Sequence, residues 1–82
     1  MMMTTEVTLT NSIKVERAKQ DLTQAQLASK AGITRRSVNA IETGRMVPSV
    51  LLALRIARAL DVSIESLFAL RETLPDPTRL YE

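Results

Sequence analysis

Residues 23–45, TQAQLASKAGITRRSVNAIETGR, constrain this chain most, because they predict two short helices joined by a tight turn. The hydroxyl of Thr23 can accept from the free N–H groups that open the first helix, and Gln26 completes a capping-box pattern. Gly32 can take the left-handed backbone conformation in which many helices end. Thr34 is expected to cap the second helix.

The second helix of this pair has an apolar face and a polar face. Val38 and Ile41 lie three residues apart, so they project from one side toward the core. The other side carries two arginines, an amide and small side chains, namely Arg35, Arg36, Ser37, Asn39 and Ala40. Such a surface suits the recognition of polar edges.

Three further helices are expected around this pair. The first begins after Asn11 or Ser12 as its cap and runs to about Gln20. The fourth begins after Ser49 and carries an inward apolar stripe of Leu51, Leu54, Ala57 and Leu60. The last is a short helix capped by Ser63, in which Ile64, Leu67 and Phe68 close the core.

The two ends of the chain leave alternatives open. The alternation in TEVTLT, residues 5–10, is typical of a short strand, but a lone strand needs a partner, so a disordered tail is the other interpretation. Residues 71–74 could extend the last helix, which the prolines at 75 and 77 must stop. Residues 78–82 form either a frayed end or a short strand. We therefore expect an all-α five-helix domain over residues 12–70, between tails of residues 1–11 and 71–82.

Composition argues against several classes of protein. The 82 residues suffice for one domain and include no histidine and no cysteine, which removes the commonest general bases, thiol nucleophiles and metal ligands. Both glycines end helices, so there is no glycine-rich phosphate loop. We expect no enzyme activity, no cofactor and no metal. No apolar run approaches the roughly 20 residues that span a membrane, the start lacks the features of a signal peptide, and a cytoplasmic protein is expected.

Charge is informative through its distribution. The net charge is only +2, but four cations and one acid, Glu42, lie between Lys30 and Arg45. A local excess of cations on a polar helix face favours a nucleic-acid partner.

The pattern L-T-Q-x-x-L-A-x-x-x-G-I-T-x-x-x-V-x-x-I-E-x-G, from Leu22 to Gly44, resembles the helix-turn-helix of the phage-repressor-like (Cro/C1-type, XRE) family of bacterial and phage DNA-binding proteins. The resemblance covers about residues 13–68 and implies a compact lambda-repressor-like domain. The chain departs from the family at Asp21 and Asp61, where glycine is common. Aspartate tolerates the left-handed conformation better than most residues.

The resemblance implies a role for each polar position of the motif. Arginine can donate two hydrogen bonds to guanine, and asparagine can pair with adenine. Base contacts are expected from Thr34, Arg35, Arg36, Asn39 and Ala40, and a solvated polar face is the alternative. Phosphate contacts are expected from Thr23, Gln24, Ser37, Thr43 and Arg45. Thr43 often corresponds to an asparagine in the family.

Glu42 follows Ile41 and lies near the inward face, where an unpaired charge is costly. In the family an arginine of the first helix pairs with this glutamate, and Arg17 occupies the matching position. A structural ion pair is expected, with no catalytic role.

The sequence predicts a regulator of transcription. The helix from Arg35 to Glu42 should enter the major groove, and because one such helix reads few base pairs, we expect a homodimer on an inverted-repeat operator, acting as a repressor. A dimer contact is expected from Glu6–Thr10 or the C-terminal tail. Two alternatives remain: an antitoxin that binds a toxin through its tails and represses its own operon, and a protein-interaction module that does not bind DNA.

Overall fold

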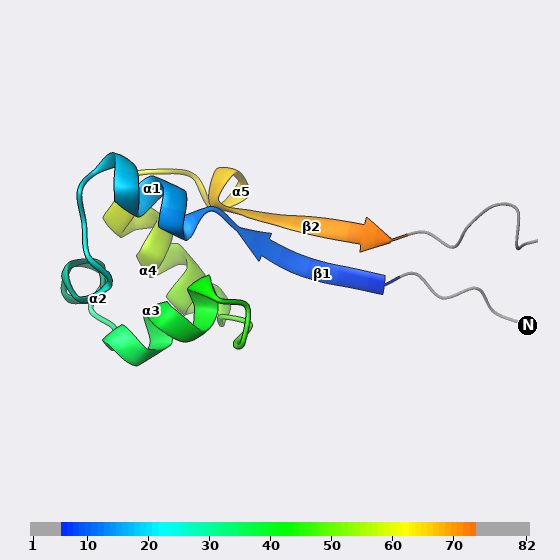
Figure 1. Cartoon of the computed structure of the whole chain (residues 1–82), viewed down its shortest axis with the longest axis horizontal. Helices are drawn as coiled ribbons and strands as arrows, with labels where there is room; N and C mark the ends of the chain where they lie inside the picture. Colours follow the sequence, from blue (N-terminus) through cyan, green and yellow to red (C-terminus); the bar gives the residue numbers. More distant parts are fainter. Residues whose placement is uncertain (1–5, 74–82) are drawn as a thin grey trace, which may run out of the picture.

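The computed structural model describes residues 6–73, which form five helices and two strands. In chain order these are β1 (Glu6–Asn11), α1 (Ile13–Lys19), α2 (Gln24–Ala31), α3 (Arg35–Glu42), α4 (Val50–Leu60), α5 (Ile64–Leu67) and β2 (Phe68–Thr73). The helices gather into one body, and the strands project from it as a two-stranded ribbon (Figure 1). The alternatives stated for residues 78–82, and the prolines at 75 and 77, lie outside the described residues.

The predicted turn between α2 and α3 is confirmed in its local chemistry. The Thr23 hydroxyl accepts from the Gln26 N–H at 3.0 Å, and the Gln26 side chain accepts from the Thr23 N–H at 2.8 Å. Gly32 ends α2 in the left-handed conformation, with φ of 70°. The Thr34 hydroxyl accepts from the Ser37 N–H at 3.1 Å and so caps α3. These short-range bonds fix where both helices of the motif begin.

A core of aliphatic side chains holds the helices together. Each of the five helices contributes at least one fully buried residue, and the largest are Ile13, Leu27, Val38, Ile41, Ile56, Leu60 and Leu67. Burying a side chain of this kind stabilises the fold by about 1.5–3 kcal/mol. Val38 and Ile41 face inward as predicted, which leaves the polar side of α3 outside.

The inward face of α4 differs from the prediction. Ala57 and Leu60 are buried as expected, but Leu51 and Leu54 are 59% and 50% exposed, and Ala53 and Ile56 take their place in the core. The sequence of α4, VLLALRIARAL, is apolar around most of its circumference, so its periodicity fits two different stripes. α4 packs against both α2 and α5, and in this packing Ala53, Ile56, Ala57 and Leu60 are the buried side chains.

The prediction of an all-α fold is wrong in one respect, because the chain also forms a small sheet. β1 and β2 pair antiparallel, from Glu6 opposite Thr73 to Asn11 opposite Phe68. The last helix therefore ends at Leu67, and residues 71–73 continue a strand instead of a helix. The strand suggested by the alternation in residues 5–10 has its partner about 60 residues along the chain, which no local pattern indicates.

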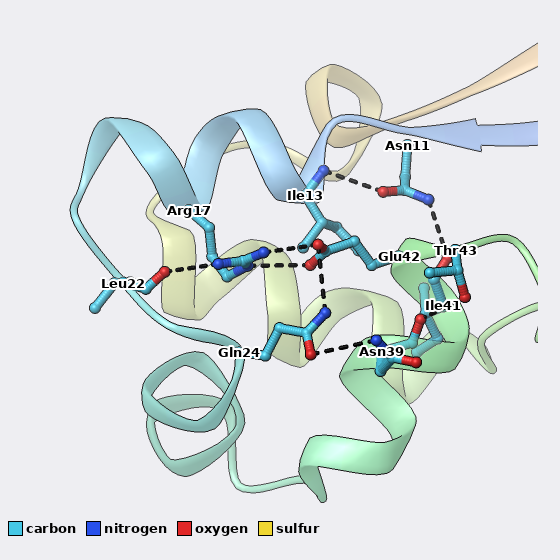
Figure 2. A network of polar contacts seen from close by, with 9 residues as sticks. All are labelled: Asn11, Ile13, Arg17, Leu22, Gln24, Asn39, Ile41, Glu42 and Thr43. Carbon is cyan, nitrogen blue, oxygen red and sulfur yellow. Dashed lines mark hydrogen bonds and ion pairs between the residues drawn. The ribbon is translucent and has the colours of Figure 1, made fainter.

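Asn11 connects the base of the ribbon to the helical body. Its Oδ1 accepts from the N–H of Ile13 at 3.1 Å, and its Nδ2 donates to the carbonyl oxygen of Ile41 at 3.0 Å (Figure 2). Ser12 makes no side-chain capping bond, so Asn11 is the residue that caps α1. One amide thus joins β1, α1 and the end of α3.

None of the helices described between residues 6 and 73 is long and apolar enough to cross a membrane.

Candidate nucleic-acid interface

The polar side of α3 and the start of α2 form an open depression of about 660 Å³. Its lining consists of Gln24, Arg35, Arg36, Asn39, Ala40 and Arg45. Four of these residues were predicted to contact bases, and Gln24 and Arg45 were predicted to contact phosphate. The fold thus brings residues from α2, α3 and the following loop to one surface.

Cations dominate this depression. Arg35, Arg36 and Arg45 are exposed, and within residues 6–73 none of them forms an ion pair. The one acid of α3, Glu42, pairs with Arg17. The depression therefore presents three positive charges, and an uncompensated cluster of cations attracts a polyanion.

Arg17 and Glu42 form a bidentate ion pair between α1 and α3. Arg17 Nε donates to Glu42 Oε2 at 3.0 Å and Nη2 donates to Oε1 at 2.7 Å, while Nη1 donates to the carbonyl oxygen of Leu22 at 2.9 Å (Figure 2). The side chains are only 16% and 6% exposed. The hydrogen bond to Glu42 raises the pKa of Arg17, the charge of Glu42 adds to this effect, and burial opposes it. The pair fixes α3 against α1.

A chain of hydrogen bonds runs from this ion pair to the surface. Gln24 Nε2 donates to Glu42 Oε1 at 3.5 Å, and Gln24 Oε1 accepts from Asn39 Nδ2 at 3.3 Å (Figure 2). Since Glu42 can only accept, Gln24 must turn its NH₂ group toward it and its oxygen toward Asn39. The buried charge therefore sets the orientation of the Asn39 amide.

Arg45 holds the other side of the same amide. Its Nη2 donates to Asn39 Oδ1, and its Nε donates to the hydroxyl of Thr43 at 3.1 Å. Thr43 in turn donates to the carbonyl oxygen of Asn39 at 2.7 Å. Asn39 keeps one N–H and one lone pair for a further partner. Sequence reasoning assigned separate roles to Asn39 and Arg45 and missed this contact, because no spacing rule relates a helical residue to one beyond the helix end.

The hydroxyl groups of the motif are largely used by the fold. Thr34 Oγ1 donates to Ser37 Oγ at 2.9 Å while it caps α3, and the Thr23 hydroxyl completes the capping box. For a base, Thr34 therefore offers mainly its methyl group. Among residues 6–73 no group of three or more His, Cys, Asp or Glu side chains could hold a metal ion. The surface is suited to binding through hydrogen bonds and charge.

The chain belongs to the helix-turn-helix family, whose model matches residues 13–67. This assignment confirms the resemblance to the phage-repressor-like, XRE-type proteins, and it supports the expectation that the chain is not an enzyme.

Several curated proteins are similar to this chain. The uncharacterized HTH-type transcriptional regulator YgzD of Bacillus subtilis is 44% identical over 62 residues, which are 76% of this chain and 94% of that protein. An uncharacterized HTH-type transcriptional regulator of Methanocaldococcus jannaschii is 45% identical over 58 residues, 71% of this chain and 88% of that protein.

Two solved structures share the fold. The restriction-modification controller protein C.AhdI of Aeromonas hydrophila superposes with a TM-score of 0.64 at 30% identity, over 66% of this chain and 82% of that protein. A putative DNA-binding protein from Bacteroides fragilis superposes with a TM-score of 0.65 at 24% identity, over 74% of this chain and 98% of that protein. The second likeness concerns the fold alone.

Proposed function

We propose that this chain is a transcriptional repressor that binds duplex DNA sequence-specifically, as a homodimer, with α3 in the major groove. The observation that carries the proposal is the depression in which three exposed arginines surround the polar side of α3. The major groove accommodates one α-helix and displays a different set of donors and acceptors for each base pair. A DNA partner also implies a cytoplasmic location.

Base recognition falls mainly to the start of α3. Arg35 and Arg36 occupy its first turn, the part of a recognition helix nearest the base edges, and each can donate two hydrogen bonds to one guanine. The methyl groups of Thr34 and Ala40 are suited to contact a thymine methyl. Asn39 has one N–H and one lone pair left, which is the pair of groups that an adenine edge requires.

Phosphate contacts flank this surface on both sides. Thr23 and Gln24 lie at the N-terminus of α2, where free N–H groups and the helix dipole favour an anion. Ser37, Thr43 and Arg45 can meet the other strand. Arg45 would place a positive charge on the backbone while it steadies Asn39, so that positioning and base reading depend on one residue.

A second copy of the chain follows from the size of the surface. One α3 helix of two turns reads only a few base pairs, so two copies on an inverted repeat are needed for useful specificity. A dimer bound at such a site would act as a repressor by occupying the promoter.

Selection from a pool of randomised duplexes tests this proposal. The wild type should enrich an inverted repeat. Arg36→Ala should lose roughly 1–3 kcal/mol at one base position of that repeat. Arg71→Ala is the matched control, because it removes an exposed arginine from the ribbon, away from the depression.

The alternatives make different predictions in the same experiment. If no sequence is enriched and Arg36→Ala and Arg71→Ala weaken binding equally, α3 does not read bases. Capture of a protein partner by the tails, with enrichment retained, would indicate an autoregulating antitoxin. Capture without any enrichment would indicate a protein-interaction module.

A further inference from the structure

An uncharged surface begins directly after the cationic depression. Residues 46–54, MVPSVLLAL, contain no charged side chain. Val50, Leu51 and Leu54 lie on one side of α4, because Leu54 is four residues from Val50 and three residues from Leu51. Together with Val47 they form what we call the α4 apolar face, and the four residues are 76% (Val47), 72% (Val50), 59% (Leu51) and 50% (Leu54) exposed.

A shallow groove of about 190 Å³ adjoins this face under the ribbon. Val47 belongs to both, so the two surfaces are continuous. The apolar residues of the groove come from the ribbon and the α3–α4 loop, and include Val7, Leu9, Phe68, Met46, Val47 and Pro48. A two-stranded ribbon is marginally stable on its own, and Val7 on this ribbon is 54% exposed.

We propose that the α4 apolar face, extended by the ribbon groove, is the surface through which two copies of this chain dimerise. This inference rests on the proposed function, which calls for a second copy but does not say where it binds. In a two-fold dimer the same patch meets itself, so like charges on the patch would repel. The chain carries a net charge of +2, and residues 46–54 provide a neutral surface on which two copies can approach.

A stable dimer interface requires the ribbon groove as well as the α4 apolar face. A stable interface buries about 800 Å² on each partner, more than four aliphatic side chains supply. The ribbon groove provides additional apolar area at one end of the α4 apolar face. A two-fold axis here also brings together the two depressions, because Arg45, which lines the depression, is only two residues from Val47.

Sedimentation equilibrium of the 82-residue chain tests the proposal. The wild type should be a dimer, and Leu51→Glu should raise the dimer dissociation constant at least about 100-fold, because it buries two charges per dimer near the centre of the interface. Val7→Lys adds a charge to the ribbon groove of each copy and should raise the dimer dissociation constant about tenfold. The effect is smaller than that of Leu51→Glu because the new cation faces Glu72 across the ribbon. Val15→Glu is the matched control, since Val15 is 55% exposed on α1, away from both surfaces.

The outcomes separate this inference from the proposed function. A monomeric wild type, or a Leu51→Glu dimer as tight as wild type, overturns the inference, and so does equal dissociation by Val15→Glu. A Val7→Lys dimer of wild-type affinity removes the ribbon groove from the interface. If dimerisation responds as expected but no duplex is enriched, the interface stands and the DNA-binding proposal fails. Circular dichroism establishes that each variant is folded.

Discussion

The amide of Asn39 on α3 donates to the side-chain oxygen of Gln24 on α2, across 3.3 Å. The bond joins the two helices of the motif on the surface that we propose faces DNA. Gln24 is itself oriented by Glu42, and Glu42 by Arg17, so a buried ion pair sets the direction of a base-reading side chain (Figure 2).

Gln24→Ala should therefore weaken DNA binding about tenfold, which corresponds to the net value of one hydrogen bond, about 1.4 kcal/mol. The variant removes the acceptor that orients Asn39 and a proposed phosphate contact. Gln26→Ala is the control on the same helix, because it breaks the capping box without reaching the depression. Fluorescence anisotropy with the selected duplex measures both variants. Equal losses of affinity would mean that Gln24 acts only through the stability of α2.

The ion pair should contribute strongly to stability. Glu42→Ala leaves Arg17 without its carboxylate partner at a site where both side chains are mostly buried, and should lower the free energy of unfolding by about 3–5 kcal/mol. The double variant Arg17→Met with Glu42→Leu should lose less, because no charge remains unpaired. Urea denaturation measures both. Unchanged unfolding of Glu42→Ala would show that the pair is energetically neutral.

The same pair gives an expected pH dependence. The pKa of Arg17 is raised in the folded protein, so its stabilising effect is fully present below the ordinary arginine pKa and is lost only as pH rises through the higher folded value. The destabilisation by Glu42→Ala should therefore be the same at about pH 7 and about pH 10. A markedly smaller destabilisation at the higher pH would show that Arg17 loses its proton at a lower pH than this environment implies.

Arg45 should influence both affinity and specificity. Arg45→Ala should reduce the slope of log affinity against log salt by about 1, as expected for one lost phosphate contact. Arg45→Lys keeps the charge, and hence the slope, but lacks the planar group that bonds both Asn39 and Thr43. It should therefore relax the preference at the base pair read by Asn39. Arg71→Ala should leave both quantities unchanged.

The two residues that end α2 and α4 should respond oppositely to substitution. Asp61 has φ of 56°, a conformation that disfavours non-glycine residues by roughly 1–2 kcal/mol. Asp61→Gly removes this strain but gains chain entropy in the unfolded state, so a net stabilisation of up to about 1 kcal/mol is expected. Gly32→Ala should destabilise by about 1 kcal/mol, because φ is 70° while the added methyl meets only ordinary contacts. Thermal unfolding measures the stability of both variants. A Gly32→Ala variant more stable than the wild type would contradict the expected backbone strain.

The sequence by itself determined the helix-turn-helix. Its caps, its glycine turn and the inward pair Val38 and Ile41 are set by contacts within a few residues, and such contacts are visible in a linear pattern. The four lining residues on α3 followed from the same pattern, because the inward face of α3 fixes which side chains are left outside. Gln24 and Arg45 were expected from their positions in the motif that resembles the family.

Only the tertiary structure decided the rest. β1 has a partner far along the chain, and α4 is apolar on so many sides that its periodicity does not distinguish the buried Ala53 and Ile56 from the exposed Leu51 and Leu54. The bond from Arg45 to Asn39 likewise needs a loop folded back onto its helix. In each case the deciding contact joins segments whose approach depends on the packing of the whole domain. Local periodicity specifies what each segment can form, and packing selects among the forms that remain.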